Sequence, residues 1–260
     1  SGSIIASRLS ENSTRSVLLL EAGPDYPDFN ELPQEIKFGY GQDRNIWAKA
    51  FGYDAKHSWN FVAKSTDQAD QMLVPRGKVV GGSSAVNSQI FLRGMPEDYD
   101  CWADLGNTNW KFEKLLPYFR MTESDRGFSD QYHGNSGPIP VTRFNENDWN
   151  PDQKAFYYSC LNLGYKDSQD LNNPLSSGVG KLPLNNENGI RWSTALGYLS
   201  KARTRTNLTI EPNSLTHKVL VKNSRAVGVE VEQNGETFKV YGNDTILCAG
   251  PIGSPHILLL

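Results

Sequence analysis

A stretch rich in glycine and serine, residues 76–87 (RGKVVGGSSAVN), constrains the fold of this chain more than any other feature. Two valines precede a Gly-Gly-Ser-Ser run, which suits a short buried segment that ends in a tight turn. Glycine lets the main chain approach a ligand closely, and the N–H groups and serine hydroxyls are then free to donate hydrogen bonds. Donors that converge in this way favour phosphate oxygens. Taken alone, the run also fits an ordinary surface turn, so its interpretation depends on the surrounding sequence.

The composition argues against several classes of function. With 26 Lys and Arg against 29 Asp and Glu, the 260-residue chain has a formal net charge of -3, which favours neither a nucleic acid nor an anionic membrane as partner. No apolar run reaches the roughly 18 residues that a membrane span needs. Cys101, Cys160 and Cys248 are too few and too far apart for a disulfide framework or a zinc site. We therefore expect no nucleic-acid partner, no transmembrane segment and no metal site.

The beginning of the chain has the pattern of a dinucleotide-binding unit. Residues 2–11 have the spacing of an amphipathic helix, and residues 16–21 form a continuous apolar run of strand length that ends in Glu21. Helix, short turn and buried strand with a terminal acid form the second half of a βαβ unit. In such a unit Gly2 takes the place of the last glycine of the phosphate turn, and Glu21, about 20 residues further on, binds a ribose hydroxyl. A purely structural α/β unit would give the same pattern.

Both ends of the sequence lead us to expect a fragment of a longer protein. The first strand and the leading glycines of the βαβ unit are absent from this sequence, and its last residues, from Ser254, form an apolar helix without a polar cap.

The remaining sequence predicts an irregular excursion, a helical middle and a strand-rich final part. Residues 24–70 have little periodicity, which is typical of a lid or a cofactor cover. Short strands are expected at residues 59–62, 72–75 and 138–141. Helices are expected from Pro96, over residues 111–121 with an interruption at Pro117, over 153–163, and from Ser193 as N-cap to about Arg203. The last strands are expected at residues 208–210, 216–221, 226–232, 238–241 and 245–248, with a hairpin turn at Asn234-Gly235.

The sequence resembles the N-terminal part of the glucose–methanol–choline (GMC) oxidoreductases, a family of FAD-dependent alcohol oxidases and dehydrogenases. The resemblance depends first on residues 77–87, with Phe91, Gly94 and Asp100 at the family's spacing. Four further stretches support it: VLLLEAGP at 17–24, HGNSGP at 133–138, RAVGVE at 225–230 and AGPIGSP at 249–255.

The fold that this resemblance implies is mixed α/β. It is an FAD-binding, Rossmann-like domain of the glutathione-reductase type, interleaved with a substrate-binding domain and incomplete in this chain. Residues 1–100, with the excursion at about 24–70 as a lid, and residues 190–260 would belong to the FAD-binding domain. Residues 101–189 would form part of the substrate-binding domain.

The resemblance also implies which residues bind FAD. Glycines and hydroxyls would follow the diphosphate and ribityl chain, Glu21 would bind the adenosine ribose, and Asn87 would lie near the isoalloxazine ring. Val219 would present its main chain to the adenine, although a core valine in a strand fits as well. The cofactor-binding residues implied are Gly2, Glu21, Arg76, Gly77, Val79, Gly81, Gly82, Ser83, Ser84, Asn87, Val219, Ala249 and Gly250. No histidine lies between Lys78 and Asp100, which favours non-covalent FAD.

In this family a base removes the proton of the substrate hydroxyl while the α-hydrogen passes as hydride to the flavin. The resemblance places that base, a histidine with a His or Asn partner, beyond Leu260. We therefore assign no catalytic residue within the chain and expect these residues alone to be inactive. The four histidines present are His57, His133, His217 and His256, and none is expected to be the base.

Several alternatives stay open at this point. The electron acceptor is oxygen or another molecule. The same fold also suits an FAD-containing hydroxynitrile lyase or a catalytically inert remnant. A nicotinamide dehydrogenase is disfavoured because the Gly-Gly-Ser-Ser run lies far from the start of the βαβ unit. The aromatic residues Trp47, Phe51, Tyr53 and Trp59 line either a substrate entrance or the core of the lid.

Overall fold

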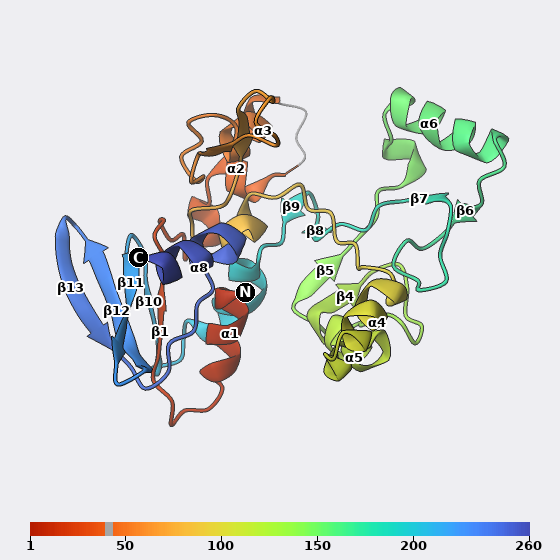
Figure 1. Ribbon diagram of the computed structural model, residues 1–260. Helices are drawn as coiled ribbons and strands as arrows, with labels where there is room; N and C mark the ends of the chain where they lie inside the picture. Colours follow the sequence, from red (N-terminus) through yellow and green to blue (C-terminus); the bar gives the residue numbers. More distant parts are fainter. Residues whose placement is uncertain (40–43) are drawn as a thin grey trace. The chain divides into compact units, whose positions relative to one another are not determined.

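The computed structural model describes residues 1–39 and 44–260, apart from the side chains of residues 44, 45, 47 and 51. The chain divides into two compact units (Figure 1). One unit combines Ser1–Asn87 with Ser193–Leu260, and the other is Ser88–Trp192. The first unit is therefore discontinuous in sequence and interleaved with the second.

The discontinuous unit is built on a parallel pair of strands. β1 (Val17–Leu20) pairs with β10 (Leu208–Glu211) in a register that sets Val17 opposite Leu208. α1 (Gly2–Leu9) precedes β1 and contributes Ala6 to a core that also contains Val80, Leu199 and Leu208. Because Val80 lies in this core, the glycine-rich segment is anchored to the same apolar cluster as α1 and β10.

An antiparallel meander follows β10. It consists of β11 (Leu215–Lys222), β12 (Arg225–Gln233) and β13 (Glu236–Tyr241), drawn in blue in Figure 1. The second hairpin turns at Asn234 and Gly235, whose φ angles of 54° and 81° are those of the predicted two-residue turn. The first hairpin turns at Asn223 and Ser224, with φ angles of 50° and 58°.

Two predictions for the last 70 residues need correction. The helix expected from Ser193 forms as a π-helical segment, η5 (Ala195–Leu199), continued by the short α7 (Ser200–Ala202). Ser193 does cap its start, because the Oγ atom accepts the N–H of Leu196 at 3.3 Å. The strand expected at residues 245–248 is not formed. A strand requires a hydrogen-bonded neighbour, and none of the described strands pairs with these residues. They run directly into α8 (Gly250–Leu259), which contacts β11.

The excursion after β1 contains more regular structure than its sequence suggests. Its elements are η1 (Phe29–Glu31), α2 (Gln34–Lys37), α3 (Arg44–Phe51), β2 (Phe61–Ala63) and β3 (Met72–Val74). β2 and β3 form the antiparallel pair that was predicted. A second core joins Ile36 and Ala50 of the excursion to Val79, Ala85 and Val86. The excursion thus packs directly on the glycine-rich segment.

The unit Ser88–Trp192 consists of short elements joined by long loops. They are α4 (Pro96–Asp104), η3 (Thr108–Trp110), α5 (Phe112–Thr122), β4 (Glu123–Asp125), β5 (Ile139–Val141), η4 (Glu146–Asp148), α6 (Pro151–Asn162), β6 (Asp167–Ser168), β7 (Val179–Gly180), β8 (Asn186–Glu187) and β9 (Ile190–Arg191). β4 and β5 form a buried parallel pair.

The prediction that Pro117 interrupts the helix is wrong. α5 continues through Pro117, although a proline inside a helix removes a hydrogen bond and costs about 3 kcal/mol. The rings of Phe112 and Phe119, on either side of the proline, both contact Tyr99 of α4 at centroid distances of 6.1 and 5.4 Å. This aromatic packing offsets the lost hydrogen bond. No helix in residues 1–39 and 44–260 combines the length and the hydropathy needed to cross a bilayer.

Candidate cofactor site

The glycine-rich segment lies against the carboxyl end of β1. The N–H of Val80 donates to the carbonyl oxygen of Pro24 at 3.0 Å. At Gly23 the two main chains are so close that a Cβ atom would lie 1.9 Å from the carbonyl oxygen of Lys78. Only glycine fits at position 23, because a Cβ atom would collide with main-chain atoms of Lys78 and Val79, which cannot move away as a flexible side chain could. Two segments that the sequence marks separately thus form one site beside Glu21.

The two serine hydroxyls hold the turn in shape. The Oγ atom of Ser83 accepts the N–H of Gly77 at 3.0 Å. The Oγ atom of Ser84 donates to the carbonyl of Gly81 at 2.7 Å and accepts the N–H of Thr194 at 3.0 Å. The Ser84 O–H is thus taken by the carbonyl of Gly81, whereas Ser83 accepts an N–H and its own O–H stays available to a ligand. Their role here is to fix the main chain of the turn.

Gly82 faces open space. It begins η2 (Gly82–Ala85) with a φ of 58°, and a Cβ atom placed on it would meet nothing within 4 Å. The main chain is therefore accessible at this point, in a backbone conformation that most side chains disfavour. This is the surface that a diphosphate or a sugar chain needs for close approach.

The Glu21 side chain is a half-buried acid directly after β1. Its Oε1 atom accepts the N–H of Gly23 at 2.9 Å. Burial raises the pKa of Glu21 to about 7, although the Gly23 hydrogen bond and the nearby Lys78 ammonium group favour the charged form. A half-buried carboxylate with so few donors is well suited to accept hydroxyl groups of a ribose.

The starts of two helices lie close together near β1. A Cβ atom on Gly2, the first residue of α1, would be 3.3 Å from Cβ of Cys248 and 3.4 Å from the side chain of Leu19. Ala249 and Gly250 follow Cys248 and begin α8. The N-terminal ends of both helices are places where main-chain N–H groups attract an anion.

Four other predicted cofactor residues are half-buried or buried: Arg76, Val79, Asn87 and Val219. Arg76 is half-buried and donates to the carbonyl of Pro75 at 2.8 Å. Val79 is buried in the second core, which leaves only its main chain for a ligand. Asn87 is half-buried, and Val219 lies opposite Val229 in the meander.

The aromatic residues of the excursion are partly described. The side chains of Trp47 and Phe51 lie outside the described residues. Tyr53 is exposed, and Trp59 stacks on Phe61 with a centroid distance of 5.7 Å. The ammonium group of Lys78 lies 4.8 Å from the centre of the Trp59 ring.

Two residues of this site escaped sequence reasoning. Thr194 supplies the N–H that holds Ser84, from 110 positions further along the chain, and no local pattern marks it. Lys78 contacts Gly23 through its main chain and Trp59 through its side chain. Its place between two glycine turns was visible in the sequence, but its partners were not.

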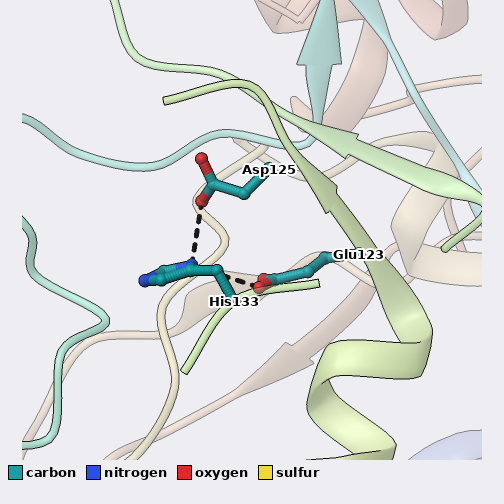
Figure 2. A group of neighbouring side chains, drawn as sticks. All are labelled: Glu123, Asp125 and His133. Atoms are coloured by element: carbon teal, nitrogen blue, oxygen red, sulfur yellow. Dashed lines mark hydrogen bonds and ion pairs between the residues drawn. The ribbon is translucent and has the colours of Figure 1, made fainter. Parts of the chain in front are cut away.

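A second polar cluster lies within the unit Ser88–Trp192, beside β4 (Figure 2). His133 is fully buried, and its Nδ1 atom lies 3.2 Å from Oε1 of Glu123 and 3.2 Å from Oδ2 of Asp125. The Nε2 atom lies 2.8 Å from Oδ2 of Asp170. By type and spacing, Glu123, Asp125 and His133 are ligands that could hold a metal ion.

The cluster already contains its own cations. Arg93 contacts Glu123 at 2.6 Å, and Arg143 contacts the two aspartates at 2.9 and 3.1 Å. Burial lowers the pKa of His133, but its hydrogen bonds to the three carboxylates outweigh burial and raise the pKa to about 11. With a protonated imidazole, three negative charges face three positive charges. The geometry therefore fits an imidazolium ion better than a metal ion.

The fold and the site define a dinucleotide-binding α/β protein whose cofactor unit is discontinuous in sequence. Comparison with known proteins then gives the family. The profile of the family described as GMC oxidoreductase matches residues 13–260. The chain belongs to the GMC oxidoreductases.

Individual relatives agree with this assignment. An oxygen-dependent choline dehydrogenase from Photobacterium profundum is 35% identical over 263 residues, covering 100% of this chain and 44% of the relative. A pyridoxine 4-oxidase from Mesorbium loti superposes with a TM-score of 0.88 at 28% identity, over 98% of this chain and 48% of that structure. For an FAD-dependent oxidoreductase from Chaetomium thermophilum the TM-score is 0.85, the identity 25%, and the coverage 98% and 45%. The chain spans about half the length of these proteins, and the predicted fold class is confirmed.

Glu21 gives a first prediction. Because the pKa of Glu21 in the folded chain lies above the ordinary value of 4.5, the folded state binds more protons than the unfolded state between about pH 4.5 and 7. The cofactor-free protein should therefore lose about 2–3 kcal/mol of stability as the pH rises through this range. Chemical denaturation at pH 5 and 7.5 measures the loss, and Glu21→Gln should abolish it.

A matched control is Glu211→Gln, at the same end of the neighbouring strand β10. This variant should keep the pH dependence of the wild type. An equal pH dependence in wild type and Glu21→Gln would contradict the assignment.

His133 gives a second prediction. The folded pKa lies above the ordinary value of 6.5, so the stabilisation is complete below about pH 6.5 and declines as the pH rises toward 11. His133→Asn leaves one buried carboxylate charge uncompensated and should lower the free energy of unfolding by about 3–5 kcal/mol at pH 6. His217→Asn is the control, because His217 pairs with Glu232 at 2.9 Å on a solvent-exposed surface. This variant should lower the free energy of unfolding by less than about 1 kcal/mol.

The protonation state itself can be observed. Nitrogen NMR at pH 8 should show both ring nitrogens of His133 protonated, and equimolar zinc or manganese should leave the melting temperature unchanged. A metal-dependent rise in the melting temperature that His133→Asn abolishes would overturn this description.

Proposed function

We propose that this protein is an FAD-dependent oxidoreductase that acts on the CH–OH group of a small-molecule alcohol. The observation that carries the proposal is the contact between residues 78–80 and residues 23–24, which brings the glycine-rich turn beside the half-buried carboxylate of Glu21. Family membership supplies the chemistry that such a site serves.

The residues of the discontinuous unit fit FAD in shape and in charge. Gly82 offers accessible main chain, and the starts of α1 and α8 offer N–H groups for the diphosphate. The carboxylate of Glu21 accepts the ribose hydroxyls, which supply donors that the protein does not. The binding surface would continue along the ribityl chain of FAD through Arg76, Gly77, Gly81, Ser83 and Ser84. Asn87 would lie near the ring system, and the main chain of Val219 would meet the adenine.

Bound FAD supplies a hydride acceptor for the α-carbon of the alcohol. The chain's own residues bind and orient the cofactor, and the base that takes the hydroxyl proton is a histidine outside these 260 residues. The cofactor is held without a covalent bond, because residues 79–99 contain no histidine. Names of relatives, such as choline dehydrogenase and pyridoxine 4-oxidase, support a small alcohol as substrate. Oxygen or another molecule then accepts the electrons.

The proposal is tested on the longest natural chain that contains these residues. The purified protein should show flavin absorbance, and acid precipitation should release the flavin into the supernatant. Under anaerobic conditions a panel of small alcohols, including choline, should bleach the absorbance. Flavin that stays oxidised with every alcohol while a cyanohydrin is cleaved would favour a lyase, and a protein without flavin would contradict the proposal.

Gly82 provides a variant that separates cofactor binding from folding. Gly82→Ala places a methyl group on the accessible main chain and should weaken FAD binding at least about 10-fold, or about 1.4 kcal/mol. Gly106→Ala is the matched control, because Gly106 also has a positive φ, of 103°, with open space in place of its Cβ atom, and lies in the other unit. Both variants should lose about 1–2 kcal/mol of stability, but only Gly82→Ala should change the dissociation constant for FAD.

A further inference from the structure

Three polar side chains behind the glycine-rich turn form a chain of contacts that the proposed function has not used. His57 is completely buried, at 0 % exposure. Its Nε2 atom lies 2.7 Å from the hydroxyl of Tyr26, and the two rings meet edge to face at a centroid distance of 5.5 Å. Its Nδ1 atom lies 3.4 Å from Oε1 of Glu35. Tyr26 and Glu35 are half-buried, and the burial of the polar His57 between them is unfavourable unless its ring has polar partners.

The imidazole of His57 is neutral. Burial lowers the pKa of His57, and the opposing attraction of Glu35 does not restore the ordinary value. In the neutral ring one nitrogen donates and the other accepts. The tautomer that suits Tyr26 accepts its hydroxyl at Nε2, and the Nδ1–H then lies near the Glu35 carboxylate in an electrostatic contact that is not a hydrogen bond.

Each of the three residues belongs to a segment that holds the glycine-rich turn. The carbonyl of His57 accepts the N–H of Lys78 at 2.8 Å. Pro24, two positions before Tyr26, accepts the N–H of Val80 at 3.0 Å.

The third segment supports the turn by packing. Ile36, next to Glu35, shares the second core with Val79, Ala85 and Val86. The side-chain series therefore ties together the three supports of residues 78–86.

We propose that Tyr26, His57 and Glu35 are positioning residues that hold the main chain of residues 78–82 in the shape that binds the dinucleotide. None of them needs to touch the cofactor. This inference rests on the proposed function. Its physical basis is preorganisation: a turn that is ordered before binding loses less conformational freedom when the ligand arrives.

Tyr26→Phe is the most conservative test, because it removes one hydroxyl and keeps the ring in place. In the cofactor-free protein it should speed amide exchange at Lys78 and Val80 by about 10-fold relative to the amides of β12. In the same protein the dissociation constant for FAD should rise by a similar factor. Tyr99→Phe is the matched control, since the Tyr99 hydroxyl accepts the N–H of Gly94 at 3.1 Å in the other unit. It should change neither quantity.

Coupling between the ends of the series gives an independent readout. Tyr26 and Glu35 act through His57, so the double variant Tyr26→Phe/Glu35→Gln should weaken FAD binding by less than the product of the two single effects. If the effect of the double variant equals the product of the two single effects, Tyr26 and Glu35 act separately. That result would overturn the proposal that they act through His57.

The two proposals fail in different ways. If the wild type binds no FAD, the proposed function fails, and amide exchange at Lys78 and Val80 still tests whether the series holds the turn. A second outcome is that the wild type binds FAD while Tyr26→Phe changes neither the exchange at these amides nor the dissociation constant. In that case only the positioning role of Tyr26, His57 and Glu35 is wrong. Faster exchange spread evenly over the whole chain would show a purely global effect and would also overturn it.

Discussion

The close approach of main chain at Gly23 to main chain at Lys78 is the contact on which this structure depends. With 1.9 Å between a hypothetical Cβ atom at Gly23 and the Lys78 carbonyl, any side chain at position 23 would separate the two segments. The hydrogen bond from Val80 to Pro24 would then be lost as well. Val80 could no longer reach the core with Leu199 and Leu208. One steric requirement thus links the carboxyl end of β1, the turn and the apolar core.

The segments that the structure brings together beside β1 are visible in the sequence because their signals are local. Residues 81–84 and the apolar run that ends in Glu21 each follow rules that act over a few residues. What the sequence could not predict are the contacts that use long sequence separations. The Ser84 hydroxyl, for example, accepts the N–H of Thr194 from 110 positions away, a contact that no local pattern indicates. The strand expected at residues 245–248 failed for a related reason: apolar β-branched residues favour an extended chain, but a strand needs a paired neighbour, which composition does not reveal.

The two buried acidic sites show opposite solutions to the same electrostatic problem. Around His133, the charges of three carboxylates, two guanidinium groups and one imidazolium cancel one another, although Nε of Arg93, Nε of Arg143 and Oε2 of Glu123 make no hydrogen bond. At Glu21, the main-chain N–H groups of Gly23 and Ala22 and the charge of Lys78 do not offset burial, so the pKa of its carboxyl group is raised. A balanced cluster is a structural element, whereas an unbalanced buried acid is prepared for a partner that brings donors. This difference separates a site that resembles a metal centre from one that fits a cofactor.

The difference between groups that serve the fold and groups that serve a ligand also applies to the uncharged polar groups that pack against the turn. The Ser83 and Ser84 hydroxyls bond main-chain groups of Gly77 and Gly81, and the hydroxyl of Tyr26 bonds the imidazole of His57, whose carbonyl accepts the N–H of Lys78. A binding surface made of main chain has no side chains that can adjust to a ligand. Its shape therefore has to be fixed by side chains that pack against it on the side away from the ligand. Polar groups that contact no ligand then influence affinity through geometry alone. That is why the sequence features most visible around the turn, its hydroxyls, turn out to be supports, while the accessible surface belongs to Gly82, a residue without a side chain.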